Sequence, residues 1–363
     1  MGTYRIALLP GDGVGPEVMG EALKVLRAVE AGFPGLRFVC TAYRTGAACY
    51  HETGSDLPPE TLEACRAADA ILFGSAGLPD VRFPDGTEIA PQLTLRILLN
   101  LYAGVRPIKR HAGVPPTLAH DPPIDYVILR ENTEGLYASR GGGVRVGDRV
   151  ATDGMVITRA GTERIVRHAF HLARRRHGAP GDGRRRVTCV DKANVLASMA
   201  FFRQVFDDVA RDFPEIEAEH AYVDAMTVHM LQRPQRFDAV VAENMFGDIL
   251  SDLGAATVGG MGLAPSADVG DAHGLFQPSH GTAPDIAGKG TANPIAQILS
   301  AAMMLDWLAN RHQDGEAGAA ARAIEAAAAK VLADPRHHTA DLGGRASTAA
   351  VGDAVAAAAR SFV

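Results

Sequence analysis

The chain has 363 residues, 47% of them hydrophobic and 21% charged, with a formal net charge of −6 at pH 7. A chain of this length is too long to fold around a single hydrophobic core, so two domains are predicted. The net negative charge argues against nucleic acid or an anionic membrane as a partner. No apolar run approaches the about 18 residues of a membrane span, the N-terminus lacks a signal-peptide stretch, and four scattered cysteines fit a cytoplasmic protein.

The N-terminal stretch reads as a short strand over residues 4–9, a glycine-rich turn, and a helix that begins at Pro16. The turn has the pattern Gly-x-Gly-x-Gly-Pro and not the Gly-x-Gly-x-x-Gly of dinucleotide-binding turns. We therefore favour a tight strand-to-helix turn over a phosphate cradle.

Further strands are predicted over residues 36–42 and 70–73, with a helix over 59–67 between them. This alternation is typical of a parallel sheet with flanking helices. Gly74 and Ser75 follow the second of these strands, at the end where open α/β sheets bind ligands, and glycine there lets a flat ring approach the backbone.

Three arginines lie at the ends of predicted elements. Arg96 is in a helix over residues 93–101, Arg106 follows it, and Arg130 ends a strand over 126–129. Each guanidinium can bind a carboxylate in bidentate fashion, so the set suits a substrate with several carboxylates. Taken singly, each is more often part of a surface ion pair.

The middle of the chain carries an expected hairpin arm over residues 141–153, of a kind that often pairs across a dimer. Basic runs at 174–177 and 184–186 are interpreted as solvated loops because the protein is acidic overall. Lys192 and Asp224 each lie near a strand end, where both could be ordinary charges.

A strand over residues 237–242 is followed by Gly247, which we expect to mark a turn, and by Asp248, which we expect to open a helix. Asp248 and Asp252 are four residues apart and share a helix face, where like charges repel. Mg²⁺ or Mn²⁺ would reverse that repulsion. A solvated acidic first turn is the alternative. Residues 259–265 form a predicted hinge, and helices follow over 295–311 and 317–332.

Six segments together resemble the β-decarboxylating hydroxyacid dehydrogenases, the isopropylmalate/isocitrate dehydrogenase family. The motifs are Leu-Pro-Gly-Asp-Gly-Val-Gly-Pro-Glu (9–17), Arg-Glu-Asn-Thr-Glu-Gly-Leu-Tyr (130–137), Asp-Lys-Ala-Asn-Val-Leu (191–196), Tyr-Val-Asp-Ala-Met (222–226), Asn-Met-Phe-Gly-Asp-Ile-Leu-Ser-Asp (244–252) and His-Gly-Thr-Ala-Pro-Asp (280–285). They occur in the family's order, and the resemblance covers nearly the whole chain.

The resemblance implies an α/β, two-domain isocitrate/isopropylmalate dehydrogenase-like fold: an open mixed sheet with flanking helices, a discontinuous first domain and a hairpin arm. Residues 1–101 and 259–363 would bind the cofactor. Residues 102–258 would bind substrate and metal and form the dimer. The active cleft would lie between the two domains.

The resemblance also implies a set of site residues. Arg96, Arg106 and Arg130 would bind the carboxylates of a 2-hydroxy acid, whose third substituent would contact Gln92, Leu93 and Val195. Asp248 and Asp252 would hold Mg²⁺ or Mn²⁺ with Asp224 from the second subunit of a homodimer. Tyr137 would be the proton donor, and Lys192, also from the second subunit, would act on the C2 hydroxyl.

For the cofactor, Asp285 is the informative residue. An acid at the adenosine ribose accepts hydrogen bonds from its hydroxyls and repels a 2′-phosphate, so NAD is expected over NADP. The remaining contacts that the resemblance implies are with Gly74, Ser75, Asn244, His280, Gly281, Thr282, Ala283 and Asn293.

The substrate's third substituent stays open at this point. Gln92 and Leu93 match neither the isopropylmalate pattern nor the isocitrate or homoisocitrate pattern, and tartrate or D-malate is a further alternative. We favour 3-isopropylmalate or a close analogue. A non-catalytic regulatory subunit is argued against because Tyr137, Lys192 and the aspartates are all present. A metal-dependent hydrolase would have no need of the segment around Asp285.

Overall fold

The computed structural model describes residues 2–363, which divide into two compact units. Unit 1 contains the chain up to Asn100, the short segment His111–Pro115 and the C-terminal part Gly259–Val363. Unit 2 contains Leu101–Arg110 and Pro116–Val258. The sequence assigned residues 111–115 to the second domain, whereas they pack with unit 1.

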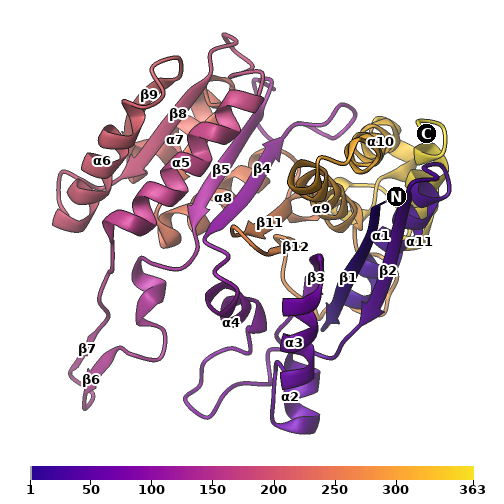
Figure 1. The fold of residues 1–363 in the computed structure, drawn as a ribbon, viewed down its shortest axis with the longest axis horizontal. Helices are drawn as coiled ribbons and strands as arrows, with labels where there is room; N and C mark the ends of the chain where they lie inside the picture. Colours follow the sequence, from indigo (N-terminus) through magenta and orange to yellow (C-terminus); the bar gives the residue numbers. More distant parts are fainter. Residues whose placement is uncertain (1) are drawn as a thin grey trace. The chain divides into compact units, whose positions relative to one another are not determined.

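Unit 1 is built from helices around one set of strands (Figure 1). Its strands are β1 (Gly2–Gly11), β2 (Leu36–Ala42), β3 (Ala70–Ser75), β11 (Pro265–Val269) and β12 (Gly274–Pro278). Its α-helices are α1 (Gly15–Glu30), α2 (Ala47–Thr53), α3 (Pro59–Ala67), α4 (Pro91–Leu98), α9 (Ile295–His312), α10 (Gly315–Leu332) and α11 (Thr348–Ala359), with short 3-10 turns η3 (Met261–Leu263), η4 (Pro335–His337) and η5 (Ala340–Leu342).

The strands of unit 1 follow the order β2-β1-β3-β12-β11. β1 pairs in parallel with β2 and β3, β12 pairs in parallel with β3, and β11 pairs antiparallel with β12. The sheet is therefore mixed. Helix α9 packs against β11 and β12 with a buried face that includes Ile298 and Leu305, and this face forms much of the unit's core.

Several elements of unit 1 differ from the sequence-based expectation. β11 and β12 were not predicted, because the glycines of 259–262 and the polar residues of 270–273 dominate that stretch. Helices α2 and α11 were also missed. α4 begins at Pro91, two residues before the expected start at residue 93, and ends at Leu98, three residues before the expected end at residue 101.

Unit 2 contains strands β4 (Ala103–Lys109), β5 (Asp125–Glu131), β8 (Arg186–Asp191), β9 (Glu217–Tyr222) and β10 (Ala239–Ala242), and a separate hairpin of β6 (Val144–Val146) and β7 (Val150–Thr152). Its helices are α5 (Arg159–Arg175), α6 (Ala197–Ala210), α7 (Val223–Gln232) and α8 (Asn244–Thr257), with 3-10 turns η1 (Leu136–Ser139) and η2 (Pro234–Arg236). The strand order is β4-β5-β10-β8-β9, antiparallel between β4 and β5 and parallel elsewhere.

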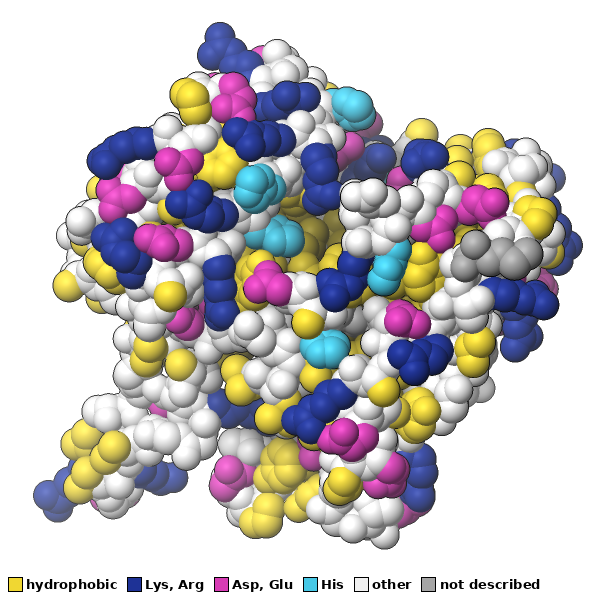
Figure 2. Space-filling view, in the orientation of Figure 1, with side chains coloured by type: hydrophobic (Ala, Val, Ile, Leu, Met, Phe, Trp, Pro, Cys, Tyr) yellow, Lys and Arg dark blue, Asp and Glu magenta, His cyan; other side chains and the backbone are white. Residues whose placement is uncertain are grey.

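The predicted hairpin arm is present as β6 and β7, which extend away from the rest of unit 2 (Figure 1). Val144, Val146 and Val150 on this arm are more than half exposed, and Figure 2 shows hydrophobic side chains along it. These valines are therefore apolar surface that nothing in the described chain covers.

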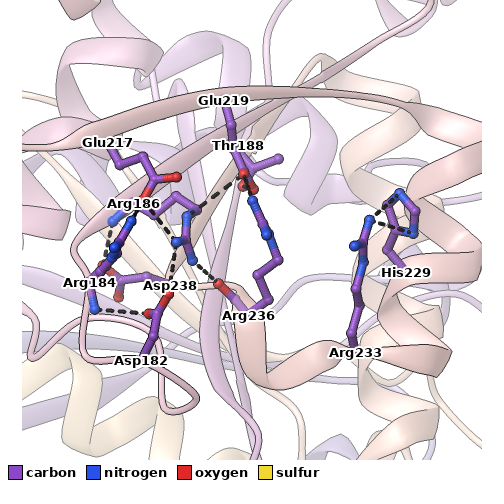
Figure 3. Close-up of polar contacts among 10 residues, drawn as sticks. All are labelled: Asp182, Arg184, Arg186, Thr188, Glu217, Glu219, His229, Arg233, Arg236 and Asp238. Carbon is purple, nitrogen blue, oxygen red and sulfur yellow. Dashed lines mark hydrogen bonds and ion pairs between the residues drawn. The ribbon is translucent and has the colours of Figure 1, made fainter.

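The outer strand of unit 2, β9, presents charged side chains toward its neighbours (Figure 3). Arg186, only 2% exposed, donates to Asp182 at 3.0 Å and to Glu217 at 2.8 Å, and Arg236 donates to Glu219 at 2.7 Å. Charges along an edge strand discourage pairing with another sheet. Arg184 also pairs with Glu217, at 3.7 Å, whereas Arg185 donates to the Arg176 carbonyl. The solvated loop expected over 184–186 is therefore wrong for Arg186, which is buried as the first residue of β8.

Within residues 2–363, no helix has both the length and the apolar character that crossing a bilayer requires.

The glycine at the end of β3 supports a structural prediction. A Cβ at Gly74 would overlap the carbonyl oxygen of Pro10 and lie 2.9 Å from the Cα of Gly15, whereas one at Gly20 in α1 would meet nothing within 4 Å. Gly74→Ala should lower the free energy of unfolding by about 1–3 kcal/mol. Gly20→Ala should raise it by up to about 1 kcal/mol. Urea unfolding of both variants checks this, and a Gly74→Ala protein as stable as the wild type would contradict it.

Candidate active site

Helix α8 begins one turn earlier than predicted. The buried side chain of Glu243 accepts hydrogen bonds from the backbone N–H groups of Met245 (3.1 Å) and Phe246 (2.8 Å), so it caps the helix and Asn244 is its first residue. Gly247 is therefore a helical residue and not a turn. A Cβ there would lie 2.7 Å from the Cβ of Arg130, so glycine lets α8 approach the end of β5 closely.

Arg130 lies at that point of closest approach and is buried. Its Nε donates to the Asn244 side-chain oxygen at 2.8 Å, its Nη1 contacts Asp248, and its guanidinium lies 5.1 Å from the centre of the Tyr137 ring. The hydroxyl of Tyr137 donates to the other oxygen of Asp248 at 2.7 Å. Four of the predicted site residues therefore form one cluster within unit 2.

Asp252 extends this cluster by one helical turn. Burial raises the pKa of its carboxyl group, the negative charge of Asp248 raises it further, and Arg106 and Arg130 offset part of that rise. Two carboxylates that disfavour each other's charge on one helix face suit a hard divalent cation, which prefers such oxygen ligands. Within residues 2–363 no group of three His, Cys, Asp or Glu side chains is placed to hold a metal ion.

The segment 131–137 fixes the position of Tyr137. Buried Glu131 accepts hydrogen bonds from the backbone N–H groups of Thr133 (2.8 Å) and Glu134 (2.5 Å), and burial raises the pKa of its carboxyl group. Gly135 has a φ of 76°, and a Cβ there would overlap Glu243. Tyr137 itself remains 38% exposed, so its hydroxyl can reach a ligand.

Lys192 and Asp224 lie together, Lys192 on the turn after β8 and Asp224 in the first turn of α7, which directly follows β9. The Lys192 ammonium donates to Asp224 at 2.7 Å, and this contact is the main cause of the lowered pKa of the exposed Asp224 carboxyl. Buried Asp191 accepts two hydrogen bonds from Arg203 and one from the N–H of Ala193, which orders the turn that carries Lys192. Val195, on the same turn, is exposed.

In unit 1, Arg96 is buried and its Nε donates to Asp268 of β11 at 3.0 Å. Gln92 lies four residues earlier on α4, so both side chains project from one face of this helix, and Leu93 follows Gln92. The Gln92 side-chain oxygen is buried and finds no hydrogen-bond partner among residues 2–363.

The glycine-rich turn after β1 contains buried Asp12, whose structural role the sequence analysis missed. Buried Asp12 accepts hydrogen bonds from the backbone N–H groups of Ala47 (2.6 Å), Ala48 (2.9 Å) and Gly77 (2.9 Å), so it caps α2 and holds the loop after β3. Ser75 donates to the backbone oxygen of Asp12 at 2.9 Å. Only the Gly-Asp-Gly pattern hinted at this role.

The predicted cofactor residues of 280–293 also lie in unit 1. Glu17 of α1 accepts hydrogen bonds from the N–H groups of Gly288 and Gly290, and the N–H of Val14 donates to the Thr282 carbonyl at 2.9 Å. Ala283 has a φ of 40°. These contacts hold the segment against the start of α1.

Some of these residues can meet a ligand more directly than others. Asp285 and Gly281 are exposed, and a Cβ at Gly281 would meet nothing within 4 Å. An exposed carboxylate beside open backbone fits a ribose diol. Burial lowers the pKa of His280. Asn293 is engaged with Asp341 and with the N–H of Ile295, and Asn244 of unit 2 with Arg130 and the Glu134 carbonyl, so both also have structural roles.

Known proteins resemble this chain in sequence and in fold. The family described as isocitrate/isopropylmalate dehydrogenase matches residues 5–355. The chain belongs to the isocitrate/isopropylmalate dehydrogenase family. The resemblance inferred from the six motifs is confirmed, and the chain is a β-decarboxylating dehydrogenase.

Two relatives illustrate the match within this family. A 3-isopropylmalate/3-methylmalate dehydrogenase from Methanocaldococcus jannaschii is 45% identical over 97% of this chain and 98% of its own length. A 3-isopropylmalate dehydrogenase from Moorella thermoacetica is also 45% identical, over 91% of each chain.

Solved structures confirm the predicted fold class. An isocitrate dehydrogenase from Methylococcus capsulatus superposes with a TM-score of 0.86 at 38% identity, covering 98% of this chain and 99% of that one. A β-decarboxylating dehydrogenase from Thermococcus kodakarensis gives a TM-score of 0.79 at 39% identity, covering 99% and 96%. The chain therefore has the fold of the isocitrate/isopropylmalate dehydrogenase family.

Proposed function

We propose that the protein catalyses the oxidative decarboxylation of 3-isopropylmalate to a 2-oxo acid and CO₂, a step of leucine biosynthesis, with NAD and Mg²⁺ or Mn²⁺. The relatives named for this substrate support the proposal. The observation that carries it is the cluster of Arg130, Tyr137 and Asp248 beside Asp252, which combines an anion-binding group, a proton donor and two hard oxygen ligands.

Asp248 and Asp252 would hold the metal together with Asp224 of a second copy of the chain. The raised pKa of the Asp252 carboxyl group, caused by burial and then by the charge of Asp248, supports this, because a bound cation would offset both effects. When bound, the metal polarises the C2 hydroxyl and stabilises the charge that develops during decarboxylation, and NAD accepts the hydride from C2.

The remaining steps belong to the protein's own side chains. Arg106 and Arg130 bind carboxylate oxygens of the substrate from unit 2, and Arg96 supplies a further guanidinium from unit 1. Lys192 of the second copy, in the neutral amine form, would accept the proton of the C2 hydroxyl and become an ammonium. After loss of CO₂ from C3, the Tyr137 hydroxyl donates a proton to that carbon.

The cofactor is proposed to bind unit 1, with the adenosine ribose on Asp285. The exposure of this carboxylate and the open backbone at Gly281 support that position, and a negative charge there disfavours a 2′-phosphate. Gly74, Ser75, His280, Thr282, Ala283 and Asn293 of unit 1 are further proposed contacts. Asn244, which belongs to unit 2, was also expected as a contact from the resemblance.

Unit 2 is proposed to form a homodimer. The exposed valines of the β6–β7 arm supply apolar surface for it. Lys192 and Asp224 are both expected to act in the active site of the other subunit. In one chain the Lys192 ammonium and the Asp224 carboxylate lie 2.7 Å apart. One surface of unit 2 therefore carries both residues.

A second candidate substrate class is favoured by one observation. The buried side-chain oxygen of Gln92 has no hydrogen-bond partner among residues 2–363, and a buried polar group without a partner is costly. A malate with a hydroxyl group at C3, as in tartrate, would donate a hydrogen bond to this oxygen, whereas the carboxylate substituents of isocitrate and homoisocitrate only accept hydrogen bonds and would leave it unsatisfied. Leu93 and Val195 favour an apolar substituent.

The decisive experiment follows NADH formation at 340 nm with NAD, Mn²⁺ and a panel of 3-isopropylmalate, isocitrate, homoisocitrate, tartrate and D-malate. We expect 3-isopropylmalate to give the highest kcat/KM and EDTA to abolish turnover. Calorimetric titration with Mn²⁺ and the acid gives a readout apart from activity. Absence of signal with every acid would refute the proposal, and a higher kcat/KM for tartrate would favour the alternative with a hydroxyl group at C3.

The ribose assignment predicts a change of cofactor preference. Asp285→Lys with Ile286→Tyr should lower the ratio of kcat/KM for NAD over NADP by about 10-fold or more, because one repulsive charge becomes attractive to a 2′-phosphate. Ile286→Tyr alone is the matched control and should change the ratio less. An unchanged ratio in the double variant would contradict the assignment.

Sharing of sites between subunits predicts complementation. Lys192→Met and Asp248→Asn homodimers should each be nearly inactive, whereas heterodimers of the two should regain activity at one intact site in two. Differently tagged copies purified as heterodimers allow this measurement. Verified heterodimers as inactive as both parents would speak against shared sites.

A further inference from the structure

The ion pair of Arg96 and Asp268 is the most deeply buried feature of unit 1 that involves a proposed substrate-binding residue. Arg96 is 4% exposed and Asp268 is 0% exposed. One oxygen of Asp268, Oδ2, accepts a hydrogen bond from Arg96 Nε at 3.0 Å and another from Gln277 Nε2 at 2.9 Å. The guanidinium on α4 is thus held from β11, with support from β12.

Both strands are themselves fixed at this point. Ser266 of β11 stands opposite Gln277 of β12, and Asp268, two residues further along β11, faces the same side of the sheet as Ser266. The hydroxyl of Ser300 on α9 accepts from the N–H of Ser266 at 3.2 Å and donates to the Gln277 carbonyl at 2.8 Å. The carboxylate therefore sits on a framework with little freedom to move.

The atom that Asp268 engages determines what the guanidinium can still do. A guanidinium offers two edges for bidentate binding, one with Nε and one with only the terminal nitrogens. A carboxylate on Nε leaves the terminal edge for a second anion and fixes the plane in which it points. A buried pair such as this seldom adds net stability compared with apolar side chains of the same size, so stability alone explains it poorly.

We propose that Asp268 is a positioning residue for substrate recognition: it orients Arg96 through Nε so that the terminal nitrogens bind a substrate carboxylate, and Gln277 keeps Asp268 in place. The proposal rests on the proposed function in taking Arg96 as a carboxylate-binding residue. It adds that the acid on β11 and the amide on β12 set the KM for the hydroxy acid without touching it.

The test is steady-state kinetics with the acid that the wild type uses best. Asp268→Asn should raise the KM for that acid by about 10- to 100-fold, since a misaligned binding group costs this much, and change the KM for NAD by less than about 2-fold. Asp268→Asn combined with Gln277→Glu returns a carboxylate to the neighbouring strand and should recover most of the loss. In an Arg96→Gln background, Asp268→Asn should raise the KM no further.

Three results would overturn the proposal: an unchanged KM for the acid in Asp268→Asn, equal rises in the KM for the acid and for NAD, or additive effects of Asp268→Asn and Arg96→Gln. If Asp268→Asn does not fold, Gln277→Leu, which keeps the ion pair, carries the test. It should raise the KM for the acid, and a wild-type value would reject the positioning role. A wild type inactive with every acid defeats the proposed function itself, so the two failures are distinguishable.

Discussion

The buried guanidinium of Arg130 is the interaction on which the chemistry of unit 2 depends. It joins the end of β5 to the first turns of α8 through Asn244 and Asp248, and it lies over the ring of Tyr137. Burying a cation is costly unless it is paired and hydrogen-bonded. The burial of Arg130 therefore favours conformations in which these partners stay in contact with it. Tyr137, the proposed proton donor, and Asp248, a proposed metal ligand, are thus both positioned by contact with Arg130.

Unit 1 uses carboxylates in a similar way, with Asp12 and Asp268 buried and Glu17 half-buried. Asp12 holds α2 and the loop after β3, Glu17 holds the segment around Gly288, and Asp268 holds Arg96. Each acid accepts hydrogen bonds from groups far away in the sequence, which fixes loops that would otherwise move. The proposed cofactor and substrate contacts of this unit therefore lie on segments tied to strands and helices, which favours precise geometry.

The family membership and the clusters support one another in different ways. The relatives indicate the reaction class, while the Asp248–Asp252 pair, the Tyr137 hydroxyl and the Lys192–Asp224 contact are the groups to which we propose to assign its chemistry in this chain. Gln92 is the residue that least fits an apolar 3-substituent, and its unsatisfied side-chain oxygen is the physical basis for the alternative in which the substrate has a hydroxyl group at C3.

The sequence alone determined the family, the α/β class, the hairpin arm and the spacing of Asp248 and Asp252, because these depend on local patterns and short motifs. It missed β11 and β12, and it placed the start of α8 at Asp248, because the Glu243 cap and the contact of Gly247 with Arg130 are tertiary. The roles of Asp12 and Asp268 were equally out of reach. An acidic side chain in a sequence looks like a surface charge, and only the packing of distant segments around it decides that it is buried and what it holds.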